Sequence, residues 1–93
     1  MSNRRAAETV TSEHRGARFT MTTGRDENGR LGEVFINAGH ANSALDAIIS
    51  DAAIAISLAL QFGCPLDIIR HALKRDGQGI AASPIGAALD LIP

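Results

Sequence analysis

The amino-acid sequence predicts an α+β fold, in which a three-stranded antiparallel β-meander packs against a long buried helix and two shorter C-terminal helices. Apolar and polar residues alternate with a period of two over residues 8–36, which is typical of half-buried strands. After Gly39 the apolar residues follow a helical period instead. The last third contains Pro65, Gly77 and Pro84, and residues of this kind start or end short helices.

The chain length allows a single domain. Its 93 residues fall below the length of about 150 residues that is typical of one domain. We expect a short N-terminal tail at residues 1–7 and one α+β domain at residues 8–93. Apolar residues make up 45% and charged residues 20% of the chain, which is typical of a globular protein rather than a disordered one.

Three strands are expected, at about residues 8–14, 17–25 and 30–37. Residues 15–16 (Arg-Gly) fit a tight turn between the first two strands. Residues 28–29 (Asn-Gly) are typical of a type I′ hairpin turn, because both residue types tolerate a positive φ. The apolar residues that alternate along these strands are Val10, Phe19, Met21, Val34 and Ile36.

A long helix is expected at residues 43–62, with Gly63 closing it in the left-handed conformation. Ser43 and Asp46 have the spacing of a capping box, in which the hydroxyl accepts from an early helical N–H and the carboxylate reaches back. Asp51 lies to one side of the polar stripe of this helix, where we expect a structural ion pair or an exposed edge rather than a catalytic acid. That stripe is about 60° wide and consists of Ser43, Asp46, Ser50, Ser57 and Gln61.

The rest of this helix is mostly Ala, Ile and Leu. We expect it to be covered on most sides, by the sheet, by other helices or by a partner chain. A domain of this size has little area with which to cover such a helix, so self-association is natural. A homo-oligomer is therefore predicted.

Two short helices are expected near the C-terminus. Pro65 fits the first position of one, whose last turn would contain Lys74 and Arg75 as complements to the negative helix end. Residues 76–83 are expected to form a loop. The sequence Ser83-Pro84 then starts another helix, with an inner face of Ile85, Ala88, Leu89 and Ile92.

The composition argues against several functions. The 9 basic and 10 acidic residues give a net charge of -1, and only three aromatic residues are present, so a nucleic-acid partner is disfavoured. A single cysteine, Cys64, excludes an internal disulfide, and a role as a small capping or packing residue is expected for it. The histidines His14, His40 and His71 lack a metal-ligand spacing. We assign no metal, no cofactor and no catalytic residue.

A cytoplasmic protein without a membrane partner is expected. The N-terminus lacks an apolar stretch of signal-peptide length. The apolar segment at residues 44–62 is interrupted by polar and charged residues, and each carboxylate at the centre of a bilayer would cost roughly 2.5–3.5 kcal/mol.

One candidate binding site lies at the start of the long helix. His40, Asn42 and Ser43 could supply donors to an anion such as phosphate, together with the free N–H groups and the dipole of the helix. Simple helix capping explains the same residues.

Three segments of the sequence resemble one family. They are residues 3–5 (NRR), residues 28–36 (NGRLGEVFI) and residues 53–66 (AIAISLALQFGCPL). In this order they are similar to the C-terminal region of vitamin-B12-dependent (class II) ribonucleotide reductases, which is often described as a TSCPD-type domain. The resemblance covers residues 3–75 well and residues 83–92 more loosely. It implies the fold of that module and a setting in nucleotide metabolism.

The chain also departs from the family. Its 93 residues contain no counterpart of the reductase barrel, with its radical-generating cysteine, its redox cysteine pair and its substrate site. His40 stands where the family tends to have Lys, and Cys64 where it more often has an apolar residue. No catalytic residue carries over, and we expect no intrinsic ribonucleotide reductase activity.

The sequence therefore predicts a stand-alone, non-catalytic accessory or interaction module, with a reductase or another protein as its partner. One alternative is a reductase-related enzyme component. Another is a small regulator that binds a nucleotide or nucleic acid through the six arginines of residues 1–30.

Overall fold

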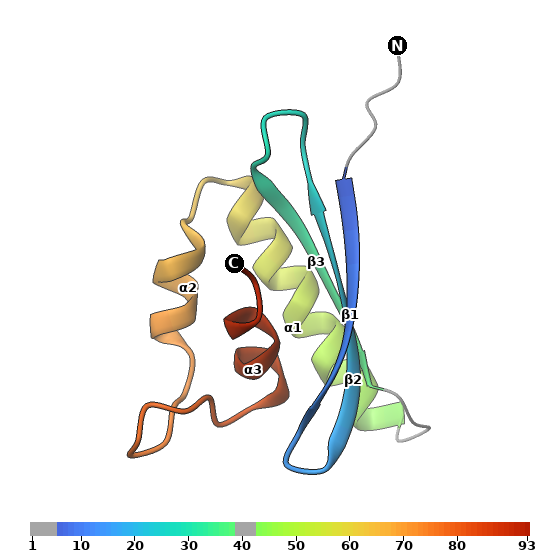
Figure 1. Ribbon diagram of the computed structural model, residues 1–93, viewed down its shortest axis with the longest axis vertical. Coiled ribbons are helices and arrows are strands. Elements are labelled where there is room, and N and C mark those ends of the chain that lie inside the picture. Colours follow the sequence, from blue (N-terminus) through green and yellow to red (C-terminus); the bar gives the residue numbers. More distant parts are fainter. Residues whose placement is uncertain (1–5, 39–42) are drawn as a thin grey trace.

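The structure is a computed structural model that describes residues 6–38 and 43–93. It confirms the predicted α+β arrangement, with a three-stranded antiparallel sheet and three helices (Figure 1). The elements in chain order are β1 (Ala6–His14), β2 (Ala17–Arg25), β3 (Leu31–Ala38), α1 (Ser43–Gln61), α2 (Leu66–Ala72) and α3 (Pro84–Asp90).

The sheet is a meander in the order β1-β2-β3. The first hairpin has the predicted two-residue turn: His14 faces Ala17, and Arg15 and Gly16 have φ values of 53° and 84°. Two positive φ values in a two-residue turn are the mark of type I′. β1 starts at Ala6, two residues earlier than the predicted strand.

The second hairpin has a different turn from the predicted type I′. Gly29 has a φ of 80°, but Asn28 has no positive φ. The Asp26 carboxylate organises the turn instead, because its Oδ1 accepts from the backbone N–H of Asn28 and of Arg30, at 2.9 Å each. The last strand pair is Arg25 with Leu31, so residues 26–30 form the loop, and the sheet register shifts just before it, between Gly24 and Arg25.

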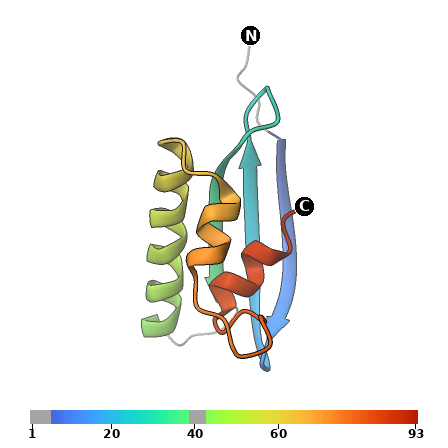
Figure 2. The same ribbon diagram turned by 90° about the vertical axis from the view of Figure 1, so that its left-hand side faces the viewer.

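All of the core lies on one face of the sheet. Figure 2 shows α1 beside β3, with α2 and α3 in front of the sheet. The opposite face is rich in threonine, and the hydroxyls of Thr9 and Thr22 lie 3.1 Å apart on it. The side chains of the core include Phe19, Met21, Val34 and Ile36 from the sheet, Ile49, Ala53, Ile56 and Leu60 from α1, and Ala88 and Leu89 from α3.

The polar stripe of α1 faces the edge of β3 that has no neighbouring strand. Asp46 Oδ1 accepts from the backbone N–H of Ala38 at 2.9 Å, a contact with β3 that the predicted capping box did not include. The Ser57 hydroxyl is buried; it accepts from the N–H of Val34 at 2.8 Å and donates to the C=O of Val34 at 2.9 Å. Two further side chains donate to the same edge: Ser50 to the C=O of Ile36 and Gln61 to the C=O of Gly32.

This packing leaves one side of α1 exposed. The sheet and the other helices of the chain cover the polar stripe of α1 and its apolar residues Ile49, Ala53, Ile56 and Leu60, while the remaining apolar side faces outward. Cover of that side by a partner chain, one of the alternatives expected from the sequence, stays a prediction. By length and composition alone, Ala44–Gln61 is apolar enough to cross a membrane. In the structure it packs on β3 in a compact domain, which is consistent with a soluble protein.

The C-terminal helices match the prediction in part. Ser83 caps α3, accepting from the N–H of Gly86 at 3.1 Å, and Pro84 follows it as predicted. α2 ends at Ala72, earlier than expected, because Leu73 is extended. Arg75 therefore lies outside the helix, in an isolated β-bridge with Ala81.

Candidate functional site

The predicted anion site is not tested by the structure. His40 and Asn42 lie outside the described residues. Ser43 is described only as the first residue of α1. Phosphate binding at these three residues therefore stays a prediction.

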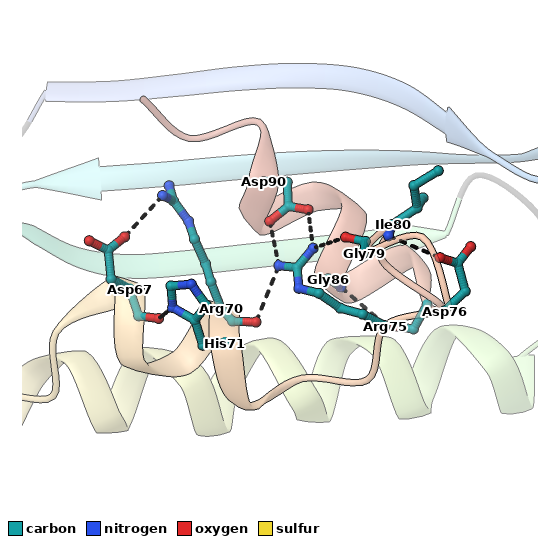
Figure 3. Close-up of polar contacts among 10 residues, drawn as sticks. Asp67, Arg70, His71, Arg75, Asp76, Gly79, Ile80, Gly86 and Asp90 are labelled. Carbon is teal, nitrogen blue, oxygen red and sulfur yellow. Dashed lines mark hydrogen bonds and ion pairs between the residues drawn. The ribbon is translucent and has the colours of Figure 1, made fainter.

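The charged side chains of the C-terminal third form a polar cluster around Arg75 (Figure 3). Its guanidinium donates to both carboxylate oxygens of Asp90, at 2.8 Å each. It also donates to the C=O of Arg70 and to the C=O of Gly79, at 3.2 Å each. One side chain thus joins the end of α2, the following loop and α3.

A second arginine continues this polar cluster. Arg70 donates to Asp67 at 3.2 Å and to the C=O of Ile92. The Nδ1 atom of His71 lies 2.7 Å from the C=O of Asp67, on the same helix. These contacts fasten the last residues of the chain to α2.

The bond to the Arg75 guanidinium lowers the pKa of Asp90 and raises the pKa of Arg75 itself. The pKa of Asp76 is also lowered, because its carboxylate accepts from the backbone N–H groups of Gln78 and Ile80. A general acid or base for neutral pH needs a pKa near 7. These shifts move the carboxyl groups further from that value, and the geometry favours a structural role.

The loop that contains Asp76 repeats the turn that contains Asp26. In each loop an Asp carboxylate accepts from the N–H groups two and four residues later, and a Gly with a φ near 80° follows three residues after the Asp. In each, the preceding Arg donates to the C=O of that Gly. The shared pattern is Arg-Asp-x-x-Gly, at residues 25–29 and 75–79. This repeat was not predicted from the sequence, although the two copies of the pattern are visible there.

Cys64 lies beside a shallow hollow between the β2–β3 turn and the end of α1. The hollow has a volume of about 300 Å³ and is lined by Arg30, Leu31, Leu60 and the segment from Gly63 to Leu66. The thiol lies 3.8 Å from the C=O of Pro65, and the side chain packs against the core. This position agrees with the predicted packing role.

The side of α1 that faces away from the sheet is exposed and mostly apolar, and we refer to it as the outer face of α1. We use this name for the exposed residues Ala44, Ala47, Ile48, Asp51, Ile54, Ala55, Leu58 and, just after the helix, Phe62. Ile48 is 65% exposed and Phe62 is 88% exposed. Asp51 is exposed among these apolar residues, as one of the two predicted alternatives required. Contiguous exposed apolar surface of this kind marks interaction sites.

The described residues show no group of three or more His, Cys, Asp or Glu side chains that could hold a metal ion.

Comparison with known proteins identifies the family of the chain. The TSCPD domain matches residues 2–90. The chain belongs to the TSCPD domain family.

Two relatives of this TSCPD domain are named vitamin B12-dependent ribonucleotide reductases. The protein from Bradyrhizobium diazoefficiens is 42% identical over 67 residues, and that from Agrobacterium fabrum is 39% identical over 67 residues. Each match covers 72% of this chain but only 5% of the relative. The predicted resemblance is therefore confirmed. No solved structure gives a significant match.

Proposed function

We propose that this TSCPD domain is a non-catalytic interaction module that binds a protein partner through the outer face of α1. The exposed apolar side chains on that face carry the proposal, above all Ile48, Leu58 and Phe62. When a partner removes apolar side chains from water, the complex is stabilised by roughly 25 cal/mol per Å² of apolar surface buried. Alanines between them allow a partner helix to approach closely.

The charge on this face indicates the chemistry of the partner. Asp51 lies near the middle of α1, surrounded by apolar residues. Two copies of α1 that packed centrally about a twofold axis would bring their Asp51 carboxylates together, and like charges in an interface cost free energy. An apolar surface with one Lys or Arg opposite Asp51 fits better. The outer face of α1 therefore suits a different protein rather than itself.

The relatives suggest which protein to test first. They are named vitamin B12-dependent ribonucleotide reductases, and the region similar to this chain is a small part of each. A reductase of this class is the partner that we propose. A cytoplasmic location follows from this proposal.

The experiment measures binding of the purified chain to the intact Bradyrhizobium diazoefficiens reductase by biolayer interferometry. The variant Ile48→Lys/Leu58→Lys places two charges on the outer face of α1, and we expect binding to weaken by about tenfold or more. Ile80→Lys is the matched control, because Ile80 is similarly exposed but lies in the α2–α3 loop. The control should bind as the wild type does.

Two results would overturn the proposal. One is no binding by the wild-type chain at about 100 µM, a concentration at which even a weak specific complex is detected. The other is equal binding by Ile48→Lys/Leu58→Lys and the wild type. Circular dichroism of both variants checks that they fold.

A further inference from the structure

The two edges of the sheet differ in whether another element covers them. The edge formed by β3 is covered by α1, whose side chains bond to its N–H and C=O groups. The edge formed by β1 has no neighbouring strand among the described residues. Of the devices that commonly protect an open edge, its nine residues contain no proline, no lysine and no register shift, and their acidic side chains are Glu8 and Glu13.

The residues of β1 whose backbone groups point outward can be worked out from those of β3. The even-numbered residues of β3, such as Val34 and Ala38, point their backbone groups toward α1. These directions alternate along an antiparallel strand. Carried through the observed register, the alternation leaves the even-numbered residues of β1 bonded to β2. The odd-numbered residues Ala7, Thr9, Thr11 and Glu13 therefore point their N–H and C=O groups outward.

We propose that β1 pairs with β1 of a second copy of this chain, in antiparallel register with Val10 on the twofold axis. β1 runs from Ala6 to His14, so its midpoint is residue 10 and all nine residues find a partner. Thr9 then faces Thr11 of the second copy, and Ala7 faces Glu13 of the second copy. These outward-pointing pairs form about eight interchain hydrogen bonds, two for each of the four pairs.

The side chains of β1 fit this register. Val10, which lies opposite Met21 of β2, is 40% exposed, and in the dimer its side chain would pack against Val10 of the second copy. Glu8 faces Ser12 of the second copy, so no carboxylate lies opposite another. The result is a continuous six-stranded sheet. This interface shares no residue with the outer face of α1, so it is independent of the proposed function.

Analytical ultracentrifugation tests the proposal through two double variants. We expect the wild type to sediment as a dimer of the 9.7 kDa chain. Thr9→Lys/Thr11→Lys places lysines opposite lysines across the interface and should give a monomer. Thr9→Lys/Thr11→Glu, changed at the same two positions, places each new lysine opposite the new glutamate of the second copy and should restore the dimer.

A cross-link supplies a second measurement if the charged variants fail to fold. In a Cys64→Ser background, Val10→Cys should form an interchain disulfide on mild oxidation, because facing residues of a non-hydrogen-bonded pair lie about 4.5 Å apart at Cα. Ser12→Cys, two residues from the axis, should not. A monomeric wild type, a dimer that survives Thr9→Lys/Thr11→Lys, a monomeric Thr9→Lys/Thr11→Glu, or equal cross-linking at positions 10 and 12 overturns the proposal. The variant Ile48→Lys/Leu58→Lys should remain dimeric even if the α1 proposal fails.

Discussion

Ser57 shows how one side chain can complete the end of a sheet. Its hydroxyl both accepts from and donates to the backbone of Val34, and the residue is 6% exposed. Water has little access there, so Ser57 supplies the hydrogen bonds that a fourth strand would supply at that point. Ser50 makes a longer contact of 3.4 Å with the C=O of Ile36 in a less buried position.

Removing the Ser57 hydroxyl should destabilise the fold. We expect Ser57→Ala to lower the free energy of unfolding by about 1–3 kcal/mol, because both backbone groups of Val34 lose a buried partner. Ser50→Ala is the matched control and should cost about 1 kcal/mol or less. Urea denaturation followed by circular dichroism measures both. Equal losses for the two variants would contradict this account of the β3 edge.

The sequence predicted the stripe that contains Ser57 but not what it contacts. A 3.6-residue period shows that polar residues share one side of a helix. It does not show whether that side meets water or unpaired backbone. Asp46 illustrates the point, because its spacing from Ser43 fits a capping box, while the chain fold brings Ala38 within its reach. The Arg75–Asp90 pair was missed for the same reason, since it joins residues that only tertiary structure brings together.

At the scale of elements, the Arg-Asp-x-x-Gly pattern builds two loops of the same conformation. One joins β2 to β3, and the other joins α2 to α3. The carboxylate and the Gly fix the loop locally, so the same five-residue pattern works between strands and between helices. Gly79 has a φ of 82°, whereas Gly77 in the same loop has no positive φ.

The two glycines of this loop should respond oppositely to alanine. Gly79→Ala forces a side chain into the left-handed region and should destabilise by about 1–2 kcal/mol. Gly77→Ala meets open space and should be neutral or stabilise by up to about 1 kcal/mol, because it restricts the unfolded chain. Thermal unfolding followed by circular dichroism compares the two. A stabilised Gly79→Ala variant would show that the loop does not require this φ.

Element boundaries could be predicted where local chemistry sets them. The turn at residues 15–16 and the Ser83-Pro84 helix start depend on neighbouring residues alone, and both are confirmed. The end of α2 could not be predicted in this way. Residues 73–76 leave the helix as Arg75 pairs with Ala81 and with Asp90, which are distant contacts.

At the scale of the whole molecule, the polar cluster holds the parts of the C-terminal third together, and an exposed ion pair connects that third to the sheet. Arg15 in the first hairpin lies 3.9 Å from Asp76 in the α2–α3 loop, and Arg75 holds that loop to α3 through Asp90. Both carboxylates have lowered pKa values. Their bonds are therefore present at neutral pH and are lost in acid.

Acid should weaken the fold partly through Asp90. Because the Arg75 bond lowers the folded pKa of Asp90 below the unfolded value of about 3.9, its stabilisation is complete above the unfolded value and is lost as the pH falls from there through the lower folded pKa. The difference in unfolding free energy between wild type and Asp90→Asn should be constant from about pH 7 to 5 and shrink below that range. Urea denaturation at stepped pH measures it. A difference that grows toward acid would reverse the assigned sign.

The contact between α1 and β3 constrains how chain length can vary in relatives of this domain. From Asp46 to Gln61 the helix rises by about 22 Å, and from Gly32 to Ala38 the strand extends by about 20 Å. One residue inserted into α1 would rotate everything after it by about 100° and carry Gln61 away from the strand. Insertions and deletions are therefore expected in the turns and in the α2–α3 loop, while the lengths of α1 and β3 stay fixed together.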